Sequence, residues 1–244
     1  MMGVEGILEC RAVTKRFGGL TAVDDFTFSV PAGHIYGLIG PNGAGKTTLF
    51  NVVSGEYGAD AGEVMFDGDT ITRLKPHRVC KRGIGRTFQT PRPLQNISVL
   101  DNVIIGAFLH TNRLEVARAE AYSTLKLIGL DKLHDRPAKS LTVPDRKRLE
   151  IAKALATKPR LLLLDEVMAG LTPTEVDELI SLVYLIRDRG VTILLIEHVM
   201  RAVINLCETV AVMSNGKKIA EGHPDNIMEN PSVIEAYLGE DYNA

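Results

Sequence analysis

The stretch Gly40-Pro41-Asn42-Gly43-Ala44-Gly45-Lys46-Thr47 decides the fold of this 244-residue chain. It fits the pattern G-x-x-x-x-G-K-[ST], in which glycines let backbone N–H groups turn inward around phosphate oxygens. The apolar run from His34 to Ile39 predicts a strand before this loop, and Lys46 to Ser54 predicts a helix after it, whose dipole favours an anion. We therefore predict a nucleotide-binding α/β domain in which Lys46 reaches the β- and γ-phosphates and the Thr47 hydroxyl holds Mg²⁺.

The net charge and the hydrophobic content of the chain exclude several classes of protein. The chain has 28 Lys and Arg against 30 Asp and Glu, a formal charge of −2, so no nucleic-acid partner is expected. A hydrophobic content of 45% excludes wholesale disorder, and no apolar run approaches the roughly 18 residues of a membrane-spanning helix. No secretory signal is expected, and the three isolated cysteines predict reduced thiols without metal spacing.

The order of the predicted elements indicates a core with an insertion. Short strands are expected on both sides of the glycine-rich loop and its helix, at Ile7–Val13, Asp25–Val30 and Glu63–Phe66. From about Thr90 to Thr157 the apolar spacing becomes helical, ending in a helix over Arg146–Ala156. We assign one domain over 1–244, with an α/β core at 1–89 and 159–222, a helical subdomain at 90–158 and a helical tail at 223–244.

The second half returns to alternating strands and helices. Arg160–Asp165 and Val191–Ile196 predict strands buried on both faces, and Asn215-Gly216 predicts the turn of a hairpin. Between the two buried strands, Thr172 at the N-cap followed by Pro173 and Glu175 marks a helix start. Strand, helix, strand in this order implies right-handed crossovers and a mostly parallel sheet.

Two carboxylates follow the first of these buried strands. Leu161-Leu-Leu-Leu-Asp165-Glu166 places them at the carboxyl edge of the sheet, where ligands bind in such folds. We expect Asp165 to hold Mg²⁺ through water and Glu166 to polarise an attacking water. The alternative is that Glu166 only solvates the end of the strand.

His198 and Gln89 are weaker candidates for the same site. His198 follows the neighbouring buried strand and could orient the water beside the γ-phosphate, although a lone histidine is more often a surface residue. Gln89, at the junction with the helical region, could touch both Mg²⁺ and the water. Its alternative is a solvated loop residue.

These elements, in this order and with a helical insert, resemble the ATP-binding subunit of an ABC transporter. The resemblance implies a P-loop NTPase core with a mostly parallel sheet, an N-terminal antiparallel β region and an inserted helical subdomain. It implies these roles in chain order: Phe17 stacks on adenine, Gly40 to Thr48 form the Walker A loop (Gly40, Pro41, Asn42, Gly43, Ala44, Gly45, Lys46, Thr47 and Thr48), Gln89 is the Q-loop glutamine, Asp165 ends Walker B, Glu166 is the catalytic glutamate and His198 the switch histidine.

Local strings are similar to the branched-chain amino-acid importer subfamily, namely Gly85-Arg-Thr-Phe-Gln-Thr90, Arg148-Leu-Glu-Ile-Ala152, Ala169-Gly-Leu-Thr-Pro-Thr174, Leu195-Ile-Glu-His198 and Ala236-Tyr-Leu-Gly-Glu240. The resemblance implies an ATP hydrolase that uses ATP and Mg²⁺ at the cytoplasmic face of the membrane. Its partners would be transmembrane permeases, a second ATPase subunit and, indirectly, a solute-binding protein. Related branches carry amides and urea, so the cargo stays open. The alternatives are an ABC ATPase outside transport and a nucleotide kinase or GTPase.

One motif departs from the family pattern. The signature Leu-Ser-Gly-Gly-Gln, which in the family binds the partner subunit's nucleotide, reads Leu141-Thr142-Val143-Pro144-Asp145 here. Thr142 keeps a hydroxyl that could reach that nucleotide, but Pro144 lacks an N–H and Asp145 brings a negative charge toward phosphate. With Thr142 as N-cap and Asp145 at N3, the helix could cap itself. We therefore expect an impaired half-site and favour a heterodimer; the alternative is a tolerated variant.

Two further features flank the Q-loop region. A basic run is interpreted as a solvated face that could lie beside the permease, and it comprises Lys75, His77, Arg78, Lys81, Arg82, Arg86 and Arg92. Phe88, Leu94 and Ile97 could line a groove for a permease helix, with core packing as the equal alternative.

Overall fold

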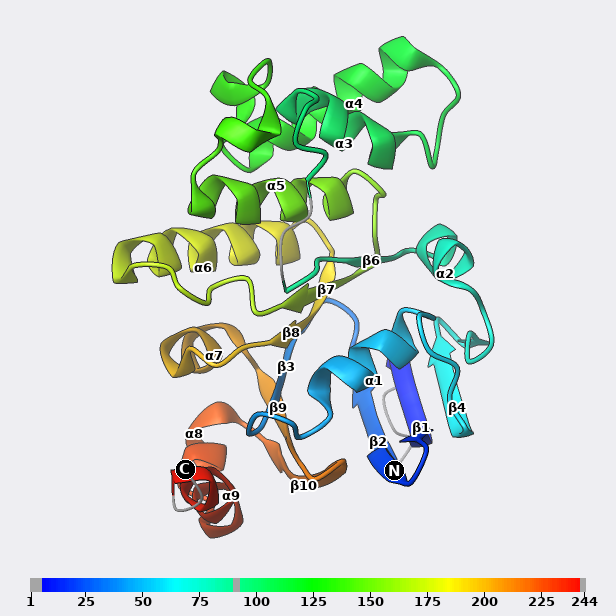
Figure 1. The fold of residues 1–244 in the computed structure, drawn as a ribbon, viewed down its shortest axis with the longest axis vertical. Coiled ribbons are helices and arrows are strands. Elements are labelled where there is room, and N and C mark those ends of the chain that lie inside the picture. Colours follow the sequence, from blue (N-terminus) through cyan, green and yellow to red (C-terminus); the bar gives the residue numbers. More distant parts are fainter. Residues whose placement is uncertain (1–5, 90–92, 242–244) are drawn as a thin grey trace.

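A six-stranded sheet forms the centre of the molecule (Figure 1). The computed structural model describes residues 6–89 and 93–241. The strand order is β10-β9-β3-β8-β7-β6, and every neighbouring pair is parallel except β9 and β10. The strands are β3 (Ile35–Ile39), β6 (Ile84–Arg86), β7 (Leu161–Asp165), β8 (Thr192–Ile196), β9 (Thr209–Ser214) and β10 (Lys217–Gly222). Because β3, β6, β7 and β8 are parallel, their carboxyl ends meet at one edge of this sheet.

A second, antiparallel sheet lies beside the first. Its order is β2-β1-β4-β5, built from β1 (Leu8–Phe17), β2 (Leu20–Val30), β4 (Ala61–Phe66) and β5 (Asp69–Thr70). Helix α1 (Lys46–Val53) shares one apolar core with both sheets, in which Phe26, Phe50 and Leu38 are fully buried. This packing fixes the start of α1 relative to the central sheet.

The remaining helices lie around the central sheet, and some of them form a helical part at one end of the molecule (Figure 1). Between β6 and β7 the chain forms the helical part at the top of Figure 1, from α3 (Val99–Ala107), α4 (Leu114–Leu127) and α5 (Val143–Leu155), with short 3₁₀ turns at Asp131–Leu133 and Ala138–Ser140. The others are α2 (Pro76–Arg82), α6 (Pro173–Arg187), α7 (Met200–Leu206), α8 (Pro224–Met228) and α9 (Pro231–Asp241). Within the described residues, no helix combines the length and apolar character needed to cross a bilayer.

The predicted fold class is confirmed. Capping residues explain where several of the helices begin. Helix α6 has the full capping box, in which Glu175 N donates to Thr172 Oγ1 and Thr172 N donates to the Glu175 carboxylate. The predicted helix start at Arg146 is wrong, because α5 begins three residues earlier behind its cap at Thr142. The cysteines are free thiols in the described part of the chain. The residue boundaries assigned to the core, helical subdomain and tail stay a prediction.

Candidate functional site

The phosphate loop contains two glycines at which a Cβ would collide with neighbouring backbone. Gly40 has a φ of 147°, and a Cβ there would lie 1.9 Å from the carbonyl oxygen of Met213. At Gly45, with a φ of 108°, a Cβ would lie 2.1 Å from the carbonyl oxygen of Ala22. The backbone of the loop therefore passes directly against β2 and β9.

Hydrogen bonds from the β9–β10 turn brace the same loop. Gly216 N donates to the carbonyl oxygen of Ala44 at 2.9 Å, and Asp24 N donates to the carbonyl oxygen of Gly216 at 2.9 Å. Elements from three parts of the sequence thus hold the loop in one shape, which is the preorganisation that a phosphate cradle requires.

The start of α1 presents positive charge to this cradle. The buried Lys46 Nζ donates to the carbonyl oxygens of Gly40 and Pro41 at 2.6 and 2.7 Å. Gly45 stands at the N-cap without a side-chain cap among the described residues, and the first turn of α1 contains no acidic residue. The backbone donors of this turn are therefore open toward an anion.

A cavity of about 490 Å³ opens over the loop. This volume falls in the range of small-ligand sites. The residues that line it are Phe17, Leu20, Thr21, Ala22, Asn42, Gly43, Ala44, Gly45, Lys46, Thr47, Thr48, Gln89, Glu166, Asn215 and Gly216. At its rim the exposed Phe17 ring packs edge-on against Tyr57, with centroids 5.3 Å apart. Tyr57, which follows the end of α1, is not predicted by any sequence motif.

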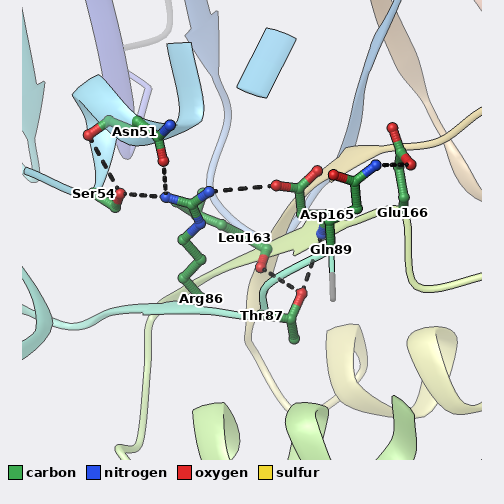
Figure 2. A network of polar contacts seen from close by, with 8 residues as sticks. All are labelled: Asn51, Ser54, Arg86, Thr87, Gln89, Leu163, Asp165 and Glu166. Carbon is green, nitrogen blue, oxygen red and sulfur yellow. Dashed lines mark hydrogen bonds and ion pairs between the residues drawn. The ribbon is translucent and has the colours of Figure 1, made fainter. Parts of the chain in front are cut away.

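Gln89 and His198 meet on the carboxylate of Glu166. Gln89 Nε2 donates to Glu166 Oε2 at 2.6 Å (Figure 2), and His198 Nε2 lies 2.7 Å from Glu166 Oε1. Because an ionised carboxylate only accepts, the histidine nitrogen is the donor of that bond. The structure thus brings together three residues that the sequence places after three different strands.

Arg86 is a site residue that the sequence interpretation placed wrongly on a solvated face. Its side chain is 9% exposed and crosses from β6 to α1, where Nη1 donates to Asn51 Oδ1 at 2.6 Å and to Ser54 Oγ at 2.8 Å (Figure 2). Nη2 pairs with Asp165 Oδ2 at 3.3 Å. Burial lowers the pKa of the Arg86 guanidinium, and Asp165 partly opposes that change. Arg86 therefore joins the phosphate-loop helix to the end of β7.

Asp165 is held on one oxygen and left open on the other. Its side chain is 1% exposed, and burial raises its pKa while Arg86 opposes the rise. Thr87 Oγ1 accepts a hydrogen bond from Asp165 N at 3.1 Å, which fixes the backbone. Asp165 Oδ1 is buried and has no hydrogen-bond partner among the described residues. A buried carboxylate oxygen without a partner suits a cation or its bound water.

The N-terminus of α5 is closed, as the sequence predicts. Thr142 Oγ1 accepts from Asp145 N at 3.3 Å and donates to Asp145 Oδ2 at 2.7 Å. Pro144 occupies the first turn, and the Val143 side chain is 58% exposed on top of it. The donors of this turn are partly satisfied within the chain, and Asp145 is its acidic residue.

The apolar residues beside the Q-loop stand mostly on the surface. Phe88 and Leu94 are exposed and Ile97 is half-buried, so core packing does not explain the first two. The Arg86 guanidinium lies 5.2 Å from the centroid of the Phe88 ring. Of the residues singled out in the sequence, Thr90 and Arg92 lie outside the described part.

The chain is similar to known proteins of one family. The family model described as "ABC transporter" matches residues 23–169, and the model described as "Branched-chain amino acid ATP-binding cassette transporter" matches residues 217–243. The chain belongs to the ABC transporter ATP-binding family. Its members bind ATP, hydrolyse it and work with transmembrane permease subunits, so this chain is an ATP-hydrolysing subunit of a transporter.

Relatives cover nearly the whole length of the chain. The high-affinity branched-chain amino acid transport ATP-binding protein BraF of Pseudomonas aeruginosa is 38% identical over 96% of this chain and 98% of its own. LivG of Escherichia coli K12, of the same description, is 37% identical over 96% and 98%. A nucleotide-free ATP-binding cassette superposes with a TM-score of 0.87 at 35% identity, covering 95% of this chain and 98% of that one. The ADP conformation of another cassette gives 0.87 at 36%, covering 96% and 98%.

Proposed function

We propose that this chain powers the import of branched-chain amino acids or chemically related amides. The observation that supports this most is the match of residues 217–243 to a model specific to branched-chain amino acid cassettes. The relatives with 37–38% identity over 96% of the chain carry the same description. The location that follows is peripheral, at the cytoplasmic face of the inner membrane.

In this proposal the cavity over the phosphate loop holds ATP. The adenine stacks on the exposed Phe17, and the phosphates take the backbone N–H groups of the loop, Lys46 Nζ and the hydroxyls of Thr47 and Thr48. A Mg²⁺ ion fits the residues present, because Asp165 Oδ1 is buried without a partner among the described residues and Thr47 and Gln89 line the cavity. Thr47, Gln89 and Asp165 would hold it, and it would neutralise phosphate charge.

Glu166 is the proposed general base. It takes a proton from a water whose oxygen attacks the γ-phosphorus, while the bond to the bridging oxygen of ADP breaks. His198 Nε2 and Gln89 Nε2 each hold one oxygen of the Glu166 carboxylate, at 2.7 and 2.6 Å. These two bonds support the assignment, because they fix the base where it faces the cavity that Glu166 lines.

The proposed partner in the nucleotide-sandwich dimer is a different ATPase subunit. The N-terminus of α5 caps itself through Thr142 and Asp145, so it offers few donors to a partner's γ-phosphate. In a homodimer both nucleotides would face this closed helix. A second subunit with an open signature would complete the site of this chain, and the permeases and a solute-binding protein would complete the transporter.

Purification from native membranes together with uptake measurement tests the proposal. We expect permeases and a second ATPase to copurify with the tagged chain. A deletion strain should regain leucine uptake from the wild-type gene but not from Glu166→Gln. Recovery of the chain alone, or with ribosomes or DNA, combined with unchanged uptake in the deletion strain, would instead favour an ABC ATPase outside transport.

A further inference from the structure

A buried lysine of α5 reaches the backbone of the catalytic turn. Lys147 is 7% exposed, and its Nζ donates to the carbonyl oxygen of Ala169 at 2.7 Å and to that of Glu166 at 3.2 Å. Lys147 lies one turn after the closed N-terminus of α5. One ammonium group therefore spans the two ends of the segment 166–169.

A buried glutamate fixes the same segment from the other side. Glu197, directly after β8, is 1% exposed, and its Oε1 accepts a hydrogen bond from Met168 N at 2.7 Å. Its Oε2 is buried without a hydrogen-bond partner among the described residues. Burial raises the pKa of Glu197 to about 7, opposed by the N–H groups of Met168 and His198 and by the charge of Lys147. Two ionisable groups of opposite charge thus bracket four residues.

The bracketed turn has a backbone that needs support. Glu166 has a φ of 50°, a left-handed conformation that non-glycine residues rarely adopt and that persists where the surroundings impose it. Glu166 N donates to the carbonyl oxygen of Ile196 at 2.9 Å. The carbonyl oxygen of the same residue accepts from Lys147 Nζ at 3.2 Å and from Ala169 N at 3.4 Å. The direction of the Glu166 side chain follows from this backbone, so Lys147 acts on where the carboxylate points.

Stability alone does not account for these two residues. Burying an ammonium and a carboxylate costs free energy that an apolar pair of similar volume would avoid. Three hydrogen bonds of the two side chains nevertheless go to backbone atoms of 166–169. The arrangement is therefore specific to the turn that carries Glu166.

We propose that Lys147 and Glu197 are positioning residues that hold Glu166 in its productive conformation. Lys147 ties the orientation of Glu166 to α5, whose N-terminus is the surface offered to the partner's nucleotide. A movement of α5 on dimer closure is then transmitted to the base of this chain's own site. The inference rests on the proposed role of Glu166.

Lys147→Met, which keeps the length of the side chain and removes the charge, is the main test in the purified transporter complex. A misplaced base lowers kcat by about 10- to 100-fold. ATP affinity and KM should stay within about twofold, because the phosphate loop is untouched. Lys147→Arg should recover part of kcat, since it restores donors to the two carbonyl oxygens. Lys153→Met is the matched control on the same helix, because the Lys153 ion pair with Glu150 does not touch 166–169.

A comparison with Glu166→Gln distinguishes a failure of this inference from a failure of the proposed function. If Glu166→Gln retains hydrolysis, the proposed base is wrong. If Glu166→Gln abolishes hydrolysis while Lys147→Met and Glu197→Gln both keep the wild-type kcat, the positioning role is overturned. It is also overturned if Lys147→Met lowers ATP affinity as much as kcat. The supporting result is a loss of kcat by Lys147→Met with ATP affinity unchanged, in the same assay in which Glu166→Gln abolishes hydrolysis.

Discussion

Two helix N-termini in this chain, that of α1 beside the phosphate loop and that of α5 at Thr142, are built in opposite ways. Helix α1 begins at Gly45 without a side-chain cap among the described residues, and Lys46 stands in its first turn. Helix α5 begins behind Thr142, whose hydroxyl bonds Asp145, and it has a proline and an acid in its first turn. The first end is open and carries a lysine, and the second is capped by its own chain and carries an aspartate.

The two helix ends therefore offer different sets of hydrogen-bond donors to a phosphate, although both belong to one chain. In the proposed function, the chain binds its own nucleotide at the start of α1, where the backbone donors are open. It presents α5 to the partner's nucleotide, and there Thr142 already accepts from Asp145 N, as Thr172 accepts from Glu175 N in α6.

Gly40→Ala breaks the open end most severely. Its Cβ would lie 1.9 Å from the Met213 carbonyl oxygen, so the loop has to move, and we expect a loss of about 3 kcal/mol of unfolding free energy. Gly43→Ala is the matched control, because its φ is 73° and its Cβ meets open space. That change should cost about 1 kcal/mol. Urea unfolding measures both, and equal losses would mean that the close approach at Gly40 is unimportant.

Lys46→Ala removes the charge of the open end without removing the loop. We expect ATP affinity to fall about 100-fold, or about 2.7 kcal/mol, because a charge-assisted contact to phosphate is lost. A fluorescent ATP analogue measures the change. Lys132→Ala, at an exposed lysine of the helical part, should bind ATP like the wild type. An unchanged affinity for Lys46→Ala would remove the basis of the contrast.

Thr142→Ala opens the closed end. The N-cap hydrogen bond to Asp145 N is lost, which should cost about 1 kcal/mol of unfolding free energy. Thr172→Ala removes the equivalent cap of α6 and serves as the reference for that magnitude. If Thr142→Ala costs nothing while Thr172→Ala does, the end of α5 is not closed in solution.

The α6 cap should make the unfolding free energy depend on pH, and this effect is smaller than those expected for α1 and α5. The Thr172 N–H holds the pKa of Glu175 below its usual range. A lowered folded pKa gives stability that is present above the unfolded pKa near 4.5 and is lost as pH falls through the folded pKa. The wild type should therefore lose more unfolding free energy than Glu175→Gln between about pH 5 and 3. Parallel curves would show that the box makes no contribution.

Much of this arrangement could be predicted from the sequence, because its signals are local. The phosphate loop, the two buried strands and the caps at Thr142 and Thr172 depend on neighbouring residues, and the structure has all of them. Arg86 was misjudged because its basic neighbours suggested a surface, whereas its partner Asp165 lies 79 residues away. Lys147 and Glu197 gave no signal for the same reason, since their contacts depend on how α5 and β8 pack against one turn.

ATP-dependent dimerisation of the purified chain tests the central claim most directly. In a Glu166→Gln background that prevents turnover, light scattering after size exclusion measures the mass with Mg²⁺ and ATP. The account predicts a monomer when Thr142 to Asp145 are native. It predicts a dimer when Thr142→Ser, Val143→Gly, Pro144→Gly and Asp145→Gln are introduced together. A dimer of equal stability with the native residues would contradict it, because the closed end of α5 would then bind a partner's nucleotide as well as an open one.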